Sequence, residues 1–293
     1  MVHKFNFSKL KIFLFVNGER GISLLYYLKK KIDNITIIAI DKKKIQKIKI
    51  KKKKIFRSIN SKSFHLYATQ QKPDIFILGG FPQIMKKKIF NIPKFGTMNL
   101  HAGKLPNYKG GSPLNWAIIN GEKSFETTII KINEGIDTGQ ILAKKKSKLF
   151  KHETIRKVHL KANINFNKII IKAIKNLINK KYYKTPKINS KYWRQRNDKD
   201  NYLDFKKKNS EQSYNFIRAL TKPYPCAWAK CRNKIIRIVD AKIVTKNSLS
   251  IPGRISYINS RPIIECLKGK LFLKKYYFEK NKKLKVIEGD FLK

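Results

Sequence analysis

Short apolar runs alternate with amphipathic stretches through the first third of the chain. Three runs are rich in β-branched and aromatic residues and predict buried strands: residues 11–16 (KIFLFV), 35–40 (ITIIAI) and 74–78 (DIFIL). Residues 22–30 have the spacing of an amphipathic helix, and residues 63–71 are a second helix candidate. This strand–helix–strand order predicts an α/β fold with a Rossmann-like, mostly parallel sheet.

The second half of the chain has a different pattern. A long helical pattern ends near residue 178 and is followed by a lysine-rich connector at residues 179–190. Apolar and polar residues then alternate in segments 235–239, 253–258, 262–266 and 271–278, which predicts a small β-barrel-like (OB-type) domain. We therefore predict two domains: residues 1–190 with the parallel sheet, and residues 191–293 with a linking helix and the barrel.

Composition excludes several classes of protein. Hydrophobic residues make up 42% of the 293 positions, which is typical of a globular chain rather than a disordered one. Apolar runs are too short to cross a membrane and the amino terminus has no convincing cleavage signal, so we expect a cytoplasmic protein without membrane insertion. Three cysteines in a chain of this length predict free thiols and no metal site.

The formal net charge of +50 raises the question of nucleic acid. Lysine, isoleucine and asparagine are abundant together, which is what A/T-rich codons supply, so codon bias accounts for much of the charge. RNA contact stays an alternative, and salt-sensitive, nonspecific adhesion to RNA is expected in either case. The densest lysine run, residues 42–54, predicts a solvated loop or sheet edge.

Residues 95–142 bring together three polar groups suited to acyl transfer. Asn99 and His101 are two apart, so on a strand their side chains share a face, and Asp137 follows a second predicted strand in a glycine-bounded loop. An amide can stabilise an oxyanion, an imidazole can donate or move a proton, and a carboxylate can orient the imidazole and accept a proton from an amine. This stretch has no Ser or Cys with an obvious activating partner, which predicts direct transfer without a covalent intermediate. Turn hydrogen bonds explain each residue singly, but the joint pattern favours catalysis.

Three motifs in order resemble the 10-formyltetrahydrofolate-dependent formyltransferases: Asn99-Leu100-His101-Ala102, Leu105-Pro106-x-Tyr108-Lys109-Gly110-Gly111-x-Pro113 and Gly135-Ile136-Asp137-Thr138-Gly139. The resemblance covers nearly the whole chain. It implies that Asn99, His101 and Asp137 are catalytic and that 10-formyltetrahydrofolate is the formyl donor. The pterin of the donor is then expected at Gly79, Gly80, Phe81, Gln83, Ile84, Gly135, Ile136 and Thr138. Acceptor contacts are expected from Asn17, Arg20, Lys109, Gly110 and Ser112. For residues 79–84, a turn that needs glycine for its backbone alone is the alternative.

The resemblance leaves open which amine accepts the formyl group. Methionyl-tRNA formyltransferases usually carry a longer glycine-containing basic loop after the second strand, whereas here a Lys/Ile run follows Asp41. The segments 110–116 (GGSPLNW) and 192–196 (YWRQR) look more like those of sugar-nucleotide N-formyltransferases. We therefore favour a nucleotide-linked amino sugar, with initiator methionyl-tRNA as the alternative and a noncatalytic folate- or RNA-binding relative as a second one. Related sugar enzymes often dimerise, so a homodimer is expected.

The chain departs from the family pattern after the predicted linking helix. The sequence Pro223-Tyr224-Pro225 is followed by Cys226, where the family usually has glycine. We expect an altered turn there, without an effect on the three catalytic residues.

Overall fold

The computed structural model describes residues 7–46, 48–184, 190–249 and 251–293, so residues 185–189 of the predicted connector lie outside the described residues. The chain groups into two compact units. The first contains Met1–Gly110, Glu126–Ser147 and Leu160–Tyr192, and the second contains Gly111–Phe125, Lys148–His159 and Trp193–Lys293. The predicted domains, residues 1–190 and 191–293, stay a prediction.

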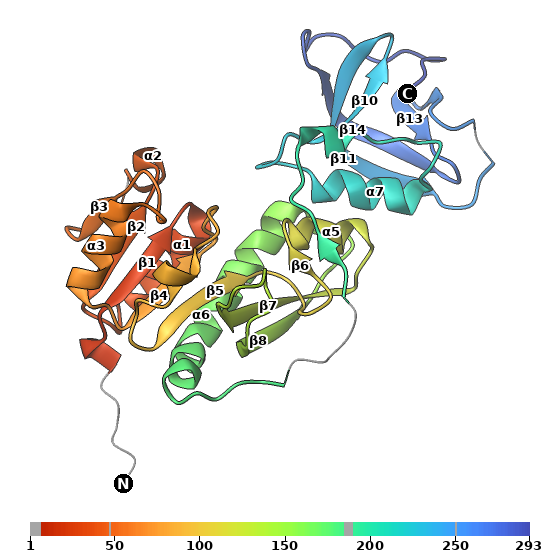
Figure 1. The fold of residues 1–293 in the computed structure, drawn as a ribbon. Coiled ribbons are helices and arrows are strands. Elements are labelled where there is room, and N and C mark those ends of the chain that lie inside the picture. The colour runs from red at the N-terminus through yellow and green to blue at the C-terminus, as the bar shows by residue number, and fades with distance from the viewer. Residues whose placement is uncertain (1–6, 47, 185–189, 250) are drawn as a thin grey trace. The chain divides into compact units, whose positions relative to one another are not determined.

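A seven-stranded sheet is the frame of the first unit (Figure 1). Its strands lie in the order β3-β2-β1-β4-β5-β7-β8; the first five are parallel, and β7 runs antiparallel to β5. The bounds are β1 (Ile12–Val16), β2 (Ile35–Ala39), β3 (Lys53–Ile55), β4 (Ile75–Gly79), β5 (Gly96–His101), β7 (Ser124–Lys131) and β8 (Ile141–Lys148). The predicted mostly parallel, Rossmann-like sheet is confirmed.

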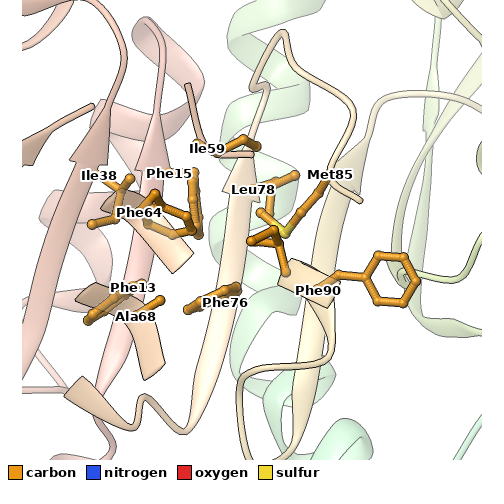
Figure 2. Close-up of a cluster of buried hydrophobic side chains, with 11 residues drawn as sticks. Phe13, Phe15, Ile38, Ile59, Phe64, Ala68, Phe76, Leu78, Met85 and Phe90 are labelled. Carbon is orange, nitrogen blue, oxygen red and sulfur yellow. The ribbon is translucent and has the colours of Figure 1, made fainter. Parts of the chain in front are cut away.

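Aromatic rings fill one face of this sheet (Figure 2). Because alternate residues of a strand share a face, Phe13 and Phe15 of β1 point to the same side, where their ring centroids lie 5.5 and 5.1 Å from that of Phe76. Helices α3 (Lys62–Gln71) and α4 (Lys87–Phe90) cover this side. Each fully buried ring contributes about 1.5 to 3 kcal/mol, so β4 and β5 rest on a close-packed core.

Helix α1 (Glu19–Leu28) packs against β1 and β4. Its start lies directly against the end of β4, because a methyl group at Gly79 would be 2.8 Å from the Cα of Gly21. The long helix α6 (Ile155–Ile178) is tied to α1 where the Asn167 amide donates to the Ser23 hydroxyl at 3.1 Å. The predicted helices at residues 22–30, at 63–71 and up to residue 178 are confirmed.

The lysine run at residues 42–54 forms a helical turn and an edge strand. Helix α2 (Lys42–Ile45) begins at Asp41, whose carboxylate accepts a hydrogen bond from the backbone N–H of Lys43 at 2.8 Å. The run ends in β3, the outermost strand of the sheet, and lysines on an edge strand disfavour pairing with another chain. The predicted sheet edge is confirmed and the helical turn was not foreseen; Lys47 lies outside the described residues.

The second unit is built on a five-stranded antiparallel sheet in the order β10-β11-β14-β13-β12. Its two edges are β10 and β12, and the carboxyl-terminal residues bond to both. Lys293 exchanges two backbone hydrogen bonds with Lys230 of β10 at 2.6 and 2.8 Å, and the N–H of Ile255 in β12 donates to the carbonyl of Asp290 at 2.7 Å. The predicted β-barrel-like domain is confirmed, although the sequence did not indicate β10. The bounds are β10 (Ala227–Cys231), β11 (Lys234–Thr245), β12 (Ile255–Ile258), β13 (Arg261–Glu265) and β14 (Lys270–Phe278).

Helices α5 (Pro113–Ile119) and α7 (Ser210–Ala219) also belong to the second unit, where the Asn115 amide donates to the carbonyl of Ala219 at 2.8 Å. The remaining short elements are η1 (Phe7–Lys9), β6 (Lys109–Gly110), β9 (Tyr192–Trp193) and η2 (Asp198–Asn201). All three cysteines are buried, and none forms a disulfide. Of the helices in the described ranges, none has the length and apolar composition that a membrane span requires.

Candidate active site

The carboxyl end of β5 brings the three predicted catalytic residues together. Asn99 and His101 lie on this strand, and Asp137 reaches both of them from the loop between β7 and β8. The Asn99 amide donates to Oδ1 of Asp137 at 3.4 Å, and Nδ1 of His101 lies 3.2 Å from Oδ2. The side chains of His101 and Asp137 are only 5% and 10% exposed, so their interaction is weakly screened by water.

The loop that carries Asp137 is fixed by close backbone contacts. Asp137 has a left-handed φ of 52°, and its Oδ2 also accepts the backbone N–H of Gly110 at 2.9 Å. Within the loop, the Thr138 hydroxyl donates to the Asn133 amide oxygen at 2.8 Å. Gly139 ends the loop beside Lys131, and a methyl group added at Gly139 would overlap the Lys131 carbonyl oxygen. The sequence Gly-Ile-Asp-Thr-Gly therefore sets where the carboxylate stands.

Both ring nitrogens of His101 face hydrogen-bond acceptors. Nε2 lies 2.6 Å from the carbonyl oxygen of Tyr108, which only accepts, so Nε2 carries a hydrogen and donates. A carboxylate also only accepts, so a hydrogen bond between Nδ1 and Asp137 requires one further proton, held on either partner. Burial lowers the pKa of His101, while the Asp137 charge and the Tyr108 carbonyl act to raise it. The His101–Asp137 pair is thus a centre that holds one transferable proton.

The residues predicted to hold the donor divide into two groups. Some have contacts within the core: Phe81 packs edge-on against Phe15 at 5.5 Å, and the Gln83 amide oxygen accepts the Ile59 N–H at 3.0 Å. Others are open to solvent, with Ile84 and Ile136 exposed by 73% and 44%. Gly80, Gly135 and Thr138 are also exposed, and Gly79 is buried.

The residues predicted to contact the acceptor lie in both units. Asn17 is half-buried just after β1 and Arg20 is in the first turn of α1, while Lys109 and Gly110 form β6, where Gly110 binds Asp137. Ser112 belongs to the second unit, where its hydroxyl accepts the backbone N–H of Arg196 at 3.3 Å.

Sequence reasoning missed two backbone groups of the site. The Tyr108 carbonyl and the Gly110 N–H complete the surroundings of His101 and Asp137. The Tyr108-Lys109-Gly110-Gly111 motif was the available signal, since glycine allows the φ of 97° at Gly110. Among the described residues, no group of three or more His, Cys, Asp or Glu side chains could hold a metal ion.

The fold and the site define an acyl-transfer class, and comparison with known families makes it specific. Residues 27–174 match the formyl transferase family, and residues 196–289 match the formyl transferase C-terminal domain. The chain belongs to the formyl transferase family.

Curated relatives include two kinds of protein. The methionyl-tRNA formyltransferase of Clostridium beijerinckii is 30% identical over 216 residues, which span 73% of this chain and 70% of that protein. The bifunctional polymyxin resistance protein ArnA of Wigglesworthia glossinidia brevipalpis is 36% identical over 220 residues, 73% of this chain. The match spans only 33% of ArnA, about a third of its length.

Solved structures share the fold at low identity. The N-formyltransferase from Helicobacter canadensis, in complex with folinic acid and dTDP-3-aminofucose, has a TM-score of 0.67 and 21% identity over 92% of this chain and 100% of its own. HypX from Aquifex aeolicus, in complex with tetrahydrofolic acid, has a TM-score of 0.67 and 14% identity over 93% of this chain and 45% of its own.

Proposed function

We propose that this protein transfers a formyl group from 10-formyltetrahydrofolate to a primary amine. The observation that carries the proposal is the meeting of Asn99, His101 and Asp137 at one strand end, with the carboxylate 3.4 Å from the amide and 3.2 Å from the imidazole. A carboxylate beside an amide donor, both partly withdrawn from water, suits the attack of an amine on an acyl carbon. Membership of the formyl transferase family supports the same reaction.

In the proposed mechanism, a neutral amine attacks the formyl carbon, so its nitrogen becomes positive and the formyl oxygen negative. The second N–H of the Asn99 amide donates to that oxygen. The Asp137–His101 centre accepts the proton that the amine nitrogen loses and delivers it to the departing folate nitrogen as its bond to the formyl carbon breaks. The products are the N-formyl compound and tetrahydrofolate, and no proton is left over.

His101 has an indirect role in the arrangement that we describe. Both of its nitrogens are engaged, by the Tyr108 carbonyl and by Asp137. The proton shared between Nδ1 and Oδ2 therefore holds the Asp137 carboxylate towards Asn99. A direct bond from Nε2 to the formyl oxygen, as the sequence suggested, requires the ring to leave the Tyr108 carbonyl first.

The residues proposed for the donor fit a flat, partly apolar ring. Ile84 and Ile136 offer exposed apolar surface from the two segments that the resemblance indicated, and Gly80 and Gly135 of the same segments are exposed. The Helicobacter and Aquifex structures were solved with folate compounds, which supports a folate donor here.

We propose a nucleotide-linked amino sugar as the acceptor. Its support is an aromatic cluster in the second unit, where the rings of Trp116 and Trp193 lie 4.9 Å apart and the Arg196 guanidinium lies 4.5 Å from the Trp116 centroid. The two rings are tilted by 40° rather than stacked on each other, and aromatic faces with an adjacent arginine suit a nucleobase and its phosphates. The cluster is joined to the Gly111 loop by a hydrogen bond from the Gly111 N–H to the Trp193 carbonyl at 2.7 Å. The Helicobacter structure was solved with a nucleotide amino sugar.

Initiator methionyl-tRNA is the second candidate acceptor, favoured by the similarity to a methionyl-tRNA formyltransferase and by the charge of +50. We propose that the partner of this protein is either a small-molecule acceptor or tRNA, and that the protein forms a homodimer. Both proposals can be tested on the same purified protein.

One assay separates these functions. The protein is incubated with 10-formyltetrahydrofolate and either charged initiator tRNA or a panel of nucleotide-linked amino sugars, and formylated product is measured by mass spectrometry. We expect product from an amino sugar, and a drop of about 100- to 1,000-fold for Asn99→Ala because one oxyanion donor is lost. Formylated methionyl-tRNA alone would overturn the acceptor, and an active wild type with a fully active Asn99→Ala variant would overturn the site. No product from any amine would favour a noncatalytic folate- or RNA-binding protein.

A further inference from the structure

Arg20 reaches three elements of the first unit from the start of α1. Its Nη1 donates to the carbonyl oxygen of Leu100 on β5 at 3.5 Å, and its guanidinium carbon lies 5.2 Å from the centroid of the Phe166 ring on α6. A methyl group at Gly80, just beyond β4, would lie 3.6 Å from the same Nη1. The half-buried guanidinium is therefore tied to β5 by a carbonyl and to α6 by a ring, and it lies beside Gly80 in the turn after β4.

The carbonyl that Arg20 contacts belongs to the residue between Asn99 and His101. A shift of the Leu100 peptide would turn the side chains before and after it, because all three residues share one short strand. Phe166 keeps the guanidinium over its ring face, where a cation is attracted to the π-electrons. Arg20 thus stabilises the position of β5, the strand that carries two of the three catalytic residues.

Arg20 is also a fixed positive charge near the proton-holding centre. Two charged groups act on His101, Asp137 and Arg20. Tyr108 acts through its backbone carbonyl, which carries no net charge. Burial is the largest cause of the lowered pKa of His101, and the Arg20 charge acts in the same direction, whereas Asp137 and the Tyr108 carbonyl oppose it. A cation at this place favours release of a proton from the centre rather than its retention.

We propose that Arg20 is a positioning residue for formyl transfer, which holds β5 through the Leu100 carbonyl and promotes proton release from the His101–Asp137 centre by its charge. This role differs from the acceptor contact that the sequence suggested. The contacts with the Leu100 carbonyl and the Phe166 ring are made to the protein's own β5 and α6, and the tests below distinguish the two roles. The kinetic part of the inference rests on the proposed function, whereas the electrostatic part does not.

The first test needs no substrate. The chain has five histidines, so the His101 imidazole signals can be assigned by NMR through their loss in His101→Gln and then titrated. In Arg20→Met, which keeps an apolar stem but removes the charge, the pKa of His101 should rise, because a cation that disfavours the protonated ring is gone. Arg20→Lys should restore the wild-type midpoint. Phe166→Leu is the matched control, which removes the ring and keeps the charge, and its midpoint should stay within error of the wild type.

The second test measures formyl transfer from 10-formyltetrahydrofolate to the best amine of the panel. Arg20→Met should lower kcat by about tenfold through loss of alignment, with the KM for the amine changed less than twofold, and its rate profile should move to higher pH. A tenfold higher KM with unchanged kcat and an unchanged His101 midpoint would show an acceptor contact instead. Far-ultraviolet circular dichroism on each variant excludes unfolding. If the wild type forms no product, the proposed function fails, while the His101 titration still decides the electrostatic role of Arg20.

Discussion

Gly139→Ala should disable the site without contact with any substrate. Gly139 ends the loop that presents Asp137, and a methyl group on it would overlap the carbonyl oxygen of Lys131, an atom of the backbone. Unlike a side chain, this carbonyl cannot rotate away. The N–H of the same peptide, on Ile132, donates to the Thr97 carbonyl at 2.8 Å, and the N–H of Lys131 donates to the Gln140 carbonyl at 2.9 Å. The loop itself must therefore move.

The size of the movement sets the expected effect. Restoring an ordinary contact requires a displacement on the order of 2 Å, since non-bonded atoms in contact are roughly 3.5 Å apart. Asp137 is two residues away and lies 3.2 Å from Nδ1 of His101, so a displacement of even 1 Å breaks that contact. We expect kcat to fall by about 100-fold, as for other ångström-scale misplacements, and the free energy of unfolding to fall by about 1 to 3 kcal/mol from overpacking.

The assay compares kcat and urea unfolding in Gly139→Ala and in a control, Gly289→Ala. Gly289 has a φ of 81°, and a methyl group added there would have nothing within 4 Å, so an alanine at this position is strained but overlaps nothing. It should cost about 1 kcal/mol of stability and leave kcat unchanged. If Gly139→Ala kept wild-type kcat and the wild-type His101 titration, the loop would not position the carboxylate and the reasoning would fail.

Three further predictions concern charge and backbone. Asp137→Asn should lower the pKa of His101, because the carboxylate that raises it is lost, and should cut kcat by about 100- to 10,000-fold; an unchanged pH–rate profile would argue against the proton route. Cys226 has a left-handed φ of 73°, so Cys226→Gly should be about 1 kcal/mol more stable than Cys226→Ala by urea unfolding, and the reverse order would contradict the strain. Arg237 binds both oxygens of Asp198 at 2.7 Å and holds the pKa of that carboxyl below 3.8, so wild-type stability should fall as pH drops below about 4. Because Asp198 is half exposed and the pair is screened by water, Arg237→Leu should lose about 1 kcal/mol at pH 7 and less at pH 3, and an equal loss at both would refute the pair.

Much of the fold was predictable because its signals are local. The runs at residues 11–16, 35–40 and 74–78 are apolar throughout, as strands buried on both faces must be, and they form β1, β2 and β4. The strand β10 was missed because its sequence, AWAKC, has weak alternation and follows a proline-rich turn. β10 pairs with β11 and with the last residue of the chain. These tertiary contacts cannot be predicted from the local sequence of β10.

The candidate site was predictable in its side chains and not in its backbone groups. The spacing of Asn99 and His101 fixes a shared face on any strand, and the glycines around Asp137 indicate a tight loop. The partner of Nε2 of His101 could not be predicted, because a carbonyl is present at every residue and only the fold selects that of Tyr108. The contact of Arg20 with Phe166 joins positions 146 residues apart along the chain (166 − 20), and a phenylalanine on an amphipathic helix gives no sign of a cationic neighbour.

Three consecutive residues, Gly110 to Ser112, each make a hydrogen bond to a residue that we propose for the reaction or for acceptor recognition. The N–H of Gly110 binds the Asp137 carboxylate, the N–H of Gly111 binds the Trp193 carbonyl, and the Ser112 hydroxyl accepts the Arg196 N–H. A side chain at Gly111 would lie 2.5 Å from the Cα of Gln195, so only glycine allows this approach. If the aromatic cluster binds the acceptor as we propose, a change of acceptor specificity should be found in residues 193–196 rather than in Asn99, His101 and Asp137. Trp193→Ala should therefore raise the KM for the amine while the titration of His101 stays unchanged.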